Sequence, residues 1–215
     1  MSGATIGKAE NKPGANAALF FRRWLANPLQ MGSVVPSSPS LCRRIAALAA
    51  RGPNEAVLEL GAGTGVVSRA LLASGVPPER LLVVEIVPDM ADHLRRALPG
   101  VEVLCGDAFD LERVLPPRWH ARVGTTICGI PLVLLPIDEQ RRFVQAVEAV
   151  APGRGFLLYT YCITSPLPHR RLGLNARREA WTFRNLPPAS VWRYWHDEAR
   201  PIPREEILAE SARMG

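Results

Sequence analysis

Short apolar runs alternate with amphipathic stretches along most of this chain. Each run is bounded by turn-forming residues, and between the runs apolar residues return every three or four positions. A short bounded apolar run is typical of a buried strand, whereas a spacing of three or four is typical of an amphipathic helix. Strands that alternate with helices predict a parallel sheet covered on both faces. We therefore expect an α/β fold with a Rossmann-like sheet.

The expected elements can be given by residue range. Strands are expected at 56–60, 81–86, from 101, at 122–130 and at 155–161. Helices are expected at 41–50, 66–74, 88–98 and 137–151. Ser40 is the expected N-cap of the helix at 41–50, which would end before Gly52-Pro53. Past the fifth strand, the aromatic-rich segments 181–184 and 190–195 flank a Pro-Pro turn, which predicts an antiparallel hairpin at the sheet edge.

The N-terminal region departs from this alternation. Residues 1–14 are polar and rich in Gly and Lys, which predicts a disordered tail, and residues 15–27 have the pattern of an amphipathic helix that ends at Pro28. The two sides of this helix carry Phe20, Phe21 and Trp24 on one side and Arg22 and Arg23 on the other. Such a helix is typical of an anchor at a membrane interface. Packing of its apolar side against the sheet is the alternative.

The same pattern suggests a domain organisation. We expect residues 15–52 to form a membrane-binding helix and a lid, and residues 53–198 to form the cofactor domain. Residues 199–215 would form a C-terminal tail with a short helix at 205–212. Within the lid, Ser37 and Ser38 would either hydrogen-bond the cofactor or cap the next helix.

Composition narrows the possible partners. The chain has 215 residues, a net charge of +6 and a pI near 9.7, which favours an anionic partner such as nucleic acid or an anionic lipid surface. A basic protein with a solvated surface is the simpler alternative. The four cysteines show neither a CxxC pair nor a His spacing suited to zinc, so we expect reduced thiols, a cytoplasmic protein and no metal. We also expect no membrane-spanning segment and no signal peptide.

A glycine-rich loop and three acidic residues supply the candidate chemistry. The loop "ELGAGTG" (59–65) follows an expected strand and precedes an expected helix, which is the context in which such a loop can approach a ligand closely. Glu59, Glu85 and Asp107 end the first three strands, so their side chains should meet at the carboxyl edge of the sheet, where ligands bind.

Each acid fits a different part of one cofactor. Glu85 could hold a ribose diol, Asp107 could accept from an adenine amino group, and Glu59 could face an ammonium group. A carboxylate beside the loop would repel a pyrophosphate, which disfavours NAD and ATP. The combination indicates S-adenosylmethionine; capping of helices or pairing with arginine is the alternative role for these acids. The expected cofactor set is Ser37, Glu59, Gly61, Gly63, Gly65, Glu85, Ile86, Asp107, Ala108 and Gly129.

These motifs resemble the class I S-adenosylmethionine-dependent methyltransferase superfamily, from about residue 55 to residue 195. The acceptor is a separate question. Methyltransferases that act on base amino groups usually carry an Asn/Asp-Pro-Pro-Tyr type of tetrapeptide after the fourth strand, whereas this chain has "CGIPLVLLP" (128–136). The stretch lacks Asn, Asp and any aromatic residue, which disfavours a nucleobase and suits a lipid; plain core packing is the alternative.

Several stretches together resemble a narrower family, the soluble bacterial phospholipid N-methyltransferases. They are "FFRRWLANPLQMGSVVPSS", "VLELGAGTG", "GIPLVLLP", "YTYCITSPL" and "FRNLPPASVWRYW". The resemblance implies stepwise methylation of phosphatidylethanolamine toward phosphatidylcholine by a cytoplasmic protein bound to the inner face of the plasma membrane. A departure from the family is Tyr161-Cys162-Ile163, where Tyr-Gly-Pro is common.

Residues near the end of the fifth strand are the candidates for acting on the acceptor. Tyr161 is the favoured group to orient the amine or relay its proton, followed by Tyr159 and then His169. For the tyrosines, core packing with a satisfied hydroxyl is the alternative, and His169 fits a surface histidine better than a proton relay. Arg170 and Arg171 could hold the lipid phosphate, although a solvated surface is an equal alternative.

Three rival functions stay open from the sequence. An ornithine lipid also offers a primary amine, and an rRNA adenine dimethyltransferase shares the expected fold and the basic charge. A catalytically silent membrane-binding module is the third rival. We expect a monomer that binds an anionic membrane surface and no nucleic acid.

Overall fold

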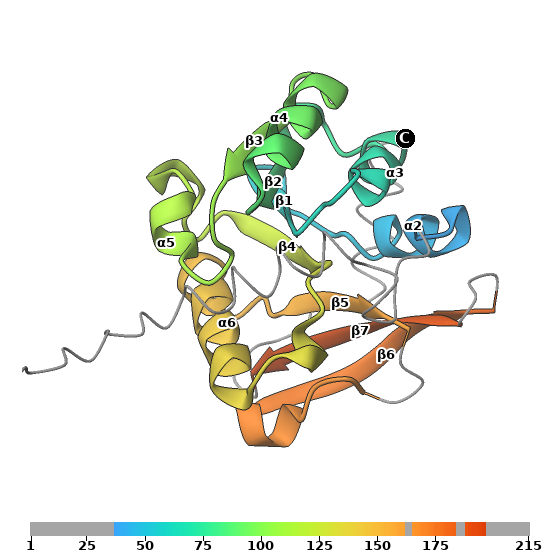
Figure 1. Cartoon of the computed structure of the whole chain (residues 1–215), viewed down its shortest axis with the longest axis vertical. Helices are drawn as coiled ribbons and strands as arrows, with labels where there is room; N and C mark the ends of the chain where they lie inside the picture. The colour runs from blue at the N-terminus through green and yellow to red at the C-terminus, as the bar shows by residue number, and fades with distance from the viewer. Residues whose placement is uncertain (1–36, 162–164, 184–187, 197–215) are drawn as a thin grey trace, which may run out of the picture.

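The computed structural model describes residues 37–161, 165–183 and 188–196 (Figure 1). The expected helices at 15–27 and 205–212 lie outside the described residues. So do the aromatic and basic residues of the expected membrane anchor: Phe20, Phe21, Arg22, Arg23 and Trp24.

A seven-stranded sheet forms the centre of the fold, with the strand order β3-β2-β1-β4-β5-β7-β6. The strands are β1 (Ala56–Leu60), β2 (Leu81–Glu85), β3 (Glu102–Cys105), β4 (Val123–Cys128), β5 (Phe156–Thr160), β6 (Leu174–Thr182) and β7 (Ala189–His196). The first five are parallel, and β7 pairs antiparallel with both β5 and β6. This arrangement confirms the expected Rossmann-like sheet of five parallel strands followed by an antiparallel hairpin.

Helices cover both faces of the sheet (Figure 1). One face packs against α2 (Pro39–Ala46), α3 (Val66–Ala73) and α4 (Pro88–Ala97). The other packs against α5 (Leu111–Val114) and α6 (Ile137–Val150). Short 3₁₀ turns, η1 (Pro78–Arg80), η2 (Pro117–Trp119), η3 (Leu132–Leu134) and η4 (His169–Leu172), connect the elements. Strands β1, β2 and β4 are buried along their whole length, because each has apolar cover on both faces.

Two expected elements have wrong bounds, and α2 also ends at Ala46, short of the expected residue 50. The helix α2 begins at Pro39 instead of Leu41, and the Ser38 hydroxyl accepts a hydrogen bond from the Leu41 N–H at 3.2 Å, so the N-cap is Ser38 and not Ser40. Proline is favoured in the first helical turn because it has no N–H to leave unsatisfied. The first hairpin strand begins at Leu174 instead of Trp181.

The hairpin also holds α2 in position. Buried Arg193 donates hydrogen bonds to Glu179 at 2.9 Å and to the Leu48 carbonyl, just past the end of α2, at 3.4 Å. At the other end of α2, the hydroxyls of Ser40 and Thr182 lie 3.3 Å apart. These contacts fix α2 and the residues just after it over the sheet face that α3 and α4 also cover.

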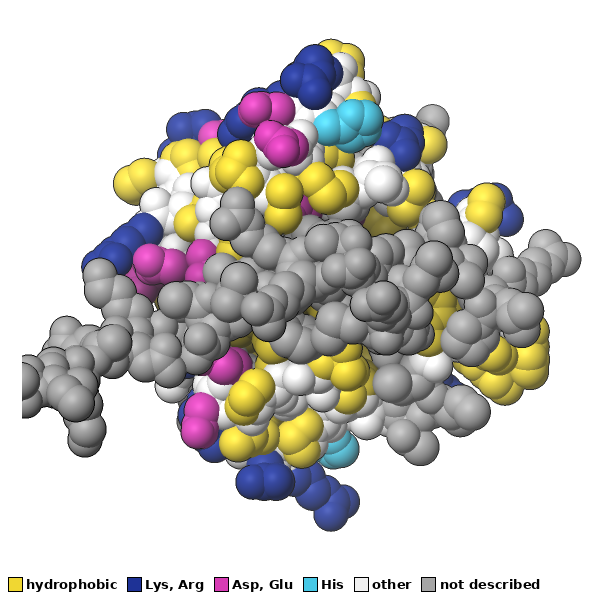
Figure 2. Space-filling view, viewed as in Figure 1, with side chains coloured by type: hydrophobic (Ala, Val, Ile, Leu, Met, Phe, Trp, Pro, Cys, Tyr) yellow, Lys and Arg dark blue, Asp and Glu magenta, His cyan; other side chains and the backbone are white. Residues whose placement is uncertain are grey.

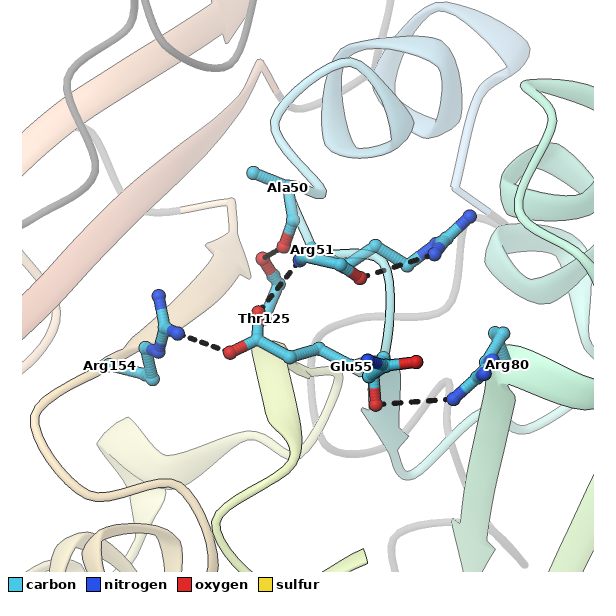
Figure 3. Close-up of polar contacts among 8 residues, drawn as sticks. Ala50, Arg51, Glu55, Arg80, Thr125 and Arg154 are labelled. Atoms are coloured by element: carbon cyan, nitrogen blue, oxygen red, sulfur yellow. Dashed lines mark hydrogen bonds and ion pairs between the residues drawn. The ribbon is translucent and has the colours of Figure 1, made fainter. Parts of the chain in front are cut away.

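A polar cluster closes the amino edge of the sheet (Figure 3). Glu55 forms an ion pair with Arg154 and accepts a hydrogen bond from the Gly52 N–H at 2.7 Å. The Thr125 hydroxyl donates to the Ala50 carbonyl. These contacts tie the residues before β1 to β4 and to the residues before β5.

Gly124, the second residue of β4, is enclosed by this cluster. A Cβ atom here would lie 2.8 Å from the Arg51 Cα and 3.1 Å from the Ala50 carbonyl oxygen, and both are backbone atoms. We expect Gly124→Ala to lower the free energy of unfolding by about 1–3 kcal/mol, the usual range for overpacking, in urea denaturation. Gly52→Ala is the matched control, because its Cβ would approach only the flexible Glu55 side chain, at 3.3 Å. An equal loss in both variants would contradict the explanation.

Candidate active site

The site lies where the strand order reverses. Strands β1 and β4 are neighbours, while the chain continues from β1 toward β2 and β3 on one side and from β4 toward β5 on the other. The loops after β1 and β4 therefore diverge, and the crevice between them is the usual ligand site of such sheets. The Gly61 N–H donates to the Val84 carbonyl at 2.9 Å and the Gly129 N–H donates to the Leu60 carbonyl at 2.8 Å, which fixes both loops to the strand ends.

The glycine loop needs its glycines for two reasons. Gly63 has a φ of +56°, and no atom lies within 4 Å of the position a Cβ would take, so the loop is open at this point. Gly65, at φ +74°, is crowded instead, because a Cβ there would lie 2.8 Å from a Leu94 methyl carbon. The loop thus turns tightly into α3, the first helix after β1, while it leaves space where a ligand can approach the backbone.

Glu59 is completely buried beneath this loop. Its Oε2 accepts a hydrogen bond from the Ser68 hydroxyl on α3 at 2.6 Å, and no described residue donates to its Oε1. Burial raises the pKa of Glu59 to about 7, with a further rise from the nearby Glu85 and an opposing effect of the Ser68 hydrogen bond. A buried carboxyl group with one unpartnered oxygen is suited to receive a donor or a cation from a ligand.

The other two acids also lie at the carboxyl edge. Glu85, the last residue of β2, is buried and accepts from the Gly63 N–H at 3.2 Å and from the Val87 N–H at 3.1 Å. Asp107, two residues past β3, accepts from the Phe109 N–H at 2.9 Å. Burial raises the pKa of both carboxyl groups, and these backbone hydrogen bonds oppose the rise. All three acids lie at or next to the carboxyl end of their strand, although only Glu85 is a last strand residue: Glu59 precedes Leu60, and Asp107 follows Cys105 by two residues.

Gly129 allows Tyr159 to reach the glycine loop. A Cβ on Gly129 would lie 2.3 Å from the Tyr159 hydroxyl oxygen and 2.7 Å from the Gly61 carbonyl oxygen. The Tyr159 phenol therefore lies between the loops that follow β1 and β4. Burial raises the pKa of Tyr159 well above its ordinary value, and nearby Glu59 adds to the rise, so the phenol is neutral at physiological pH.

Tyr161 and Ser37 meet on the same face of the sheet. A hydrogen bond joins the Tyr161 phenol to Ser37, and the Ser37 carbonyl accepts from the Cys42 thiol at 3.5 Å. Burial raises the pKa of Tyr161 despite that hydrogen bond, so this phenol also stays protonated near neutral pH. The structure thus brings Ser37, Glu59, Tyr159 and Tyr161 together under α2 and α3. A groove of about 680 Å³ continues from Ser37 between these two helices.

His169 does not join this group, and its expected proximity to the tyrosines is wrong. Thr160, at the end of β5, pairs with Ser190, whereas β6 begins opposite His196, six positions farther along β7. At about 3.3 Å per residue, this separation is roughly 20 Å. The turn η4, which carries His169, Arg170 and Arg171, precedes β6 at that far end. Neither arginine is therefore beside the expected amine position.

Some of the site's supports gave no signal in the sequence. Ser68 holds Glu59 from α3, but a serine in a helix is not by itself informative. Gln140 is buried in α6 and its amide donates to the carbonyls of Leu132 and Leu135 at 3.1 and 2.9 Å, which fixes η3 after β4. A single glutamine in an amphipathic helix gave no reason to assign this polar contact.

The residues present fit S-adenosylmethionine. Glu59 offers a buried oxygen without a described partner, Gly63 leaves open space beside the loop, and Glu85 and Asp107 present carboxylates along the same edge. Among the described residues, no cluster of His, Cys, Asp and Glu is suited to hold a metal ion. Within the same part of the chain, every helix is too short or too polar to cross a membrane.

Comparisons with known proteins agree with this site. Residues 57–153 match a family described as methyltransferase domain. An ornithine lipid N-methyltransferase from Singulisphaera acidiphila is 29% identical over 181 residues, which cover 81% of this chain and 93% of that protein.

Solved structures share the fold at low sequence identity. A TehB-like methyltransferase from Corynebacterium glutamicum has a TM-score of 0.52 at 15% identity, over 85% of this chain and 98% of that chain. A structure described as converting a disulfide bond into a thioacetal group during echinomycin biosynthesis has a TM-score of 0.56 at 17% identity, over 92% of this chain and 98% of that chain. The chain therefore has the class I methyltransferase fold with a match to a methyltransferase domain at residues 57–153, and S-adenosylmethionine is its cofactor.

The ionisation of Glu59 should make cofactor binding depend on pH. With a pKa of about 7, Glu59 is mostly protonated at pH 6 and must lose that proton to face a cationic ligand. We expect the Kd for S-adenosylmethionine to fall roughly five- to tenfold between pH 6 and 7.5 in calorimetry. Higher pH is avoided because a free α-amino group itself has a pKa of about 7.7–8.0.

Two variants check the assignment. Glu59→Gln should bind the cofactor more weakly and without this pH dependence, because the amide does not titrate. Ser68→Ala should shift the dependence to higher pH, since the hydrogen bond that lowers the pKa of Glu59 is lost. If the Kd of Glu59→Gln still depends on pH, another titrating group, such as Glu85, causes the dependence.

Proposed function

We propose that the protein transfers methyl groups from S-adenosylmethionine to the primary amine of a membrane lipid, at the membrane surface. The observation that carries the proposal is the chemistry of the segment after β4. Gly129, Ile130 and Pro131 lead into η3, and none of these side chains can hydrogen-bond a base or stack on one. An apolar segment at this position suits an acceptor whose amine is attached to a lipid.

The relative from Singulisphaera acidiphila supports a lipid acceptor. It is named as an ornithine lipid N-methyltransferase, and its similarity extends over 81% of this chain. Phosphatidylethanolamine and ornithine lipids both present a primary amine near an anionic headgroup. The sequence resemblance favours the first lipid and this relative favours the second, so both are acceptor candidates.

The chain's own groups would orient the amine. The bound cofactor supplies a methyl group on a positively charged sulfur, and an amine attacks it only through a free lone pair. The Tyr159 and Tyr161 phenols stay protonated near neutral pH, so neither acts as a tyrosinate base in the resting protein. A neutral phenol can still accept a hydrogen bond from the amine and fix the direction of its lone pair.

The electron and proton balance of the reaction is simple. The new N–C bond takes the amine lone pair, and the C–S bond breaks with its electrons on sulfur. The methylated nitrogen carries the positive charge. After a first or second transfer it loses one proton to solvent, whereas a third transfer leaves a permanent trimethylammonium cation. The bound lipid and cofactor would themselves keep water from the reacting atoms.

A methyl-transfer assay tests the proposal. Purified full-length protein would receive radiolabelled S-adenosylmethionine and vesicles that contain phosphatidylethanolamine or ornithine lipid with phosphatidylglycerol. We expect label in one of the two lipids, and thin-layer separation of mono-, di- and trimethylated products would give the methyl count. Intact cofactor binding without label in either lipid would overturn the lipid acceptor. Total RNA as a third acceptor would detect a nucleic-acid methyltransferase.

Tyr161→Phe tests the role of the favoured tyrosine. Positive charge develops on the nitrogen as the N–C bond forms, and a hydrogen bond to a charged group is worth about 1.5–3 kcal/mol, so we expect kcat on the lipid to fall roughly tenfold or more. The Kd for S-adenosylmethionine should change by less than about threefold, since the phenol is assigned to the acceptor. Ser37→Ala is the matched control: it removes the phenol's hydrogen-bond partner but keeps the phenol, so its effect should be smaller. An unchanged kcat in Tyr161→Phe would remove Tyr161 from the mechanism.

A further inference from the structure

Exposed apolar side chains gather at one edge of the sheet. Of the residues that the structure describes, four large hydrophobic side chains are exposed: Val133 at 40%, Leu134 at 47%, Trp181 at 38% and Phe183 at 73%. Val133 and Leu134 belong to η3, which follows the carboxyl end of β4. Trp181 and Phe183 lie at the end of β6, which runs parallel to β5 because each pairs antiparallel with β7. All four therefore lie at the carboxyl edge.

These side chains form two ridges on either side of β5. The η3 ridge is Val133 and Leu134, and the β6 ridge is Trp181 and Phe183. In the order β4-β5-β7-β6, the strands that carry them are three steps apart, or about 14 Å at the usual strand spacing. The end of β5, with Tyr161 just beyond it, lies between the ridges. In Figure 2, hydrophobic side chains are visible on several parts of the surface around the atoms drawn in grey.

The η3 ridge is held rigidly from below. Its neighbours Leu132 and Leu135 are buried at 1% and 9% exposure, and the carbonyls of both accept hydrogen bonds from the buried Gln140 amide. The exposed pair therefore stands on a fixed turn. The buried Gln140 side chain thus supports a turn that exposes Val133 and Leu134. Isolated hydrophobic residues on a surface are common and need no such support.

The β6 ridge has the composition of a membrane interface. The rings of Trp181 and Phe183 are 4.1 Å apart, and the Arg178 guanidinium lies 5.5 Å from the Trp181 ring. Aromatic rings beside arginine are favoured at headgroup depth, where the cation meets anionic lipid. Neither ridge contains a carboxylate, and the acids that begin α6, Asp138 and Glu139, each form an ion pair with an arginine.

We propose that the η3 and β6 ridges insert into an anionic lipid bilayer and seat the open carboxyl edge directly on the membrane surface. The proposal rests on the lipid acceptor proposed above. A lipid that is lifted fully out of a bilayer loses about 0.8 kcal/mol for each exposed CH₂ group, so an enzyme that seats its open edge on the surface avoids that cost. The ridges leave between them the end of β5, where an amine headgroup would meet Tyr161. This contact is separate from the expected anchor at residues 15–27.

A pair of double variants of the full-length protein tests the ridges. Leu134→Ser with Phe183→Ser removes the apolar surface, while Leu134→Met with Phe183→Leu keeps it and serves as the matched control. Sedimentation with vesicles of phosphatidylethanolamine and phosphatidylglycerol measures the partition of each protein. We expect the serine pair to partition roughly tenfold less and the control pair to change by less than about twofold. Calorimetry with S-adenosylmethionine should show that both pairs keep the cofactor site.

Two acceptor forms separate membrane contact from headgroup binding. Methyl transfer would be measured on lipid in vesicles and on a short-chain, water-soluble lipid with the same headgroup. The serine pair should lose activity on vesicles and keep it on the soluble lipid. Equal loss on both would make the ridges part of the amine pocket and overturn the proposal. Unchanged partition of the serine pair would overturn it as well.

Further outcomes distinguish the membrane contact from the proposed lipid acceptor, and a membrane from a second copy of the chain as the partner of the ridges. If wild type methylates neither lipid but the serine pair still loses vesicle partition, the membrane contact holds and the proposed function fails. If light scattering shows a wild-type dimer that the serine pair dissociates, the ridges are an interface between two copies and the membrane proposal fails.

Discussion

A carboxyl group that is buried at the end of the first strand sets the main constraint on this structure. Glu59 has no exposure, one of its oxygens has no described partner, and burial holds its pKa near 7. Such a group costs folding free energy unless a donor or a cation approaches it. The Ser68 hydroxyl offsets part of that cost, and it can do so because the tight glycine loop brings α3 directly back over β1. The loop, the helix after it and the acid thus form one unit, arranged for a cationic ligand more than for stability.

The two faces of the carboxyl edge have different chemistry. On the face covered by α2 and α3, Glu59, Ser37 and the two tyrosine phenols lie together, and buried Arg193 fixes the end of α2 to the hairpin. On the face covered by α6, the segment after β4 is apolar and ends in an exposed pair of aliphatic side chains. A single sheet edge therefore separates a polar side suited to a charged cofactor from an apolar side suited to a lipid.

Local sequence patterns predicted the strands whose burial on both faces requires a continuous apolar run. The central strands are buried on both faces, so their apolar runs were unambiguous, and the acids were found because each ends such a run. The start of β6 was missed because an edge strand that exposes Arg177 and Arg178, with an irregular register just after them, has no clean alternation. His169 was misplaced for a different reason. It lies eight residues after Tyr161 in sequence, but the chain first returns to the opposite edge of the sheet, and no local pattern reports that path.

The apolar acceptor side also bears on the chemistry of an amine substrate. Neither tyrosine phenol is ionised near neutral pH, so neither acts as a tyrosinate base beside the end of β5. An ammonium group that enters a poorly hydrated site is destabilised relative to the neutral amine, because low polarity disfavours the charged form and lowers its pKa. The same apolar surroundings that suit the lipid would therefore favour the free lone pair that methyl transfer requires. In this arrangement, low polarity both binds the lipid and favours loss of the ammonium proton. The phenols then only direct the lone pair.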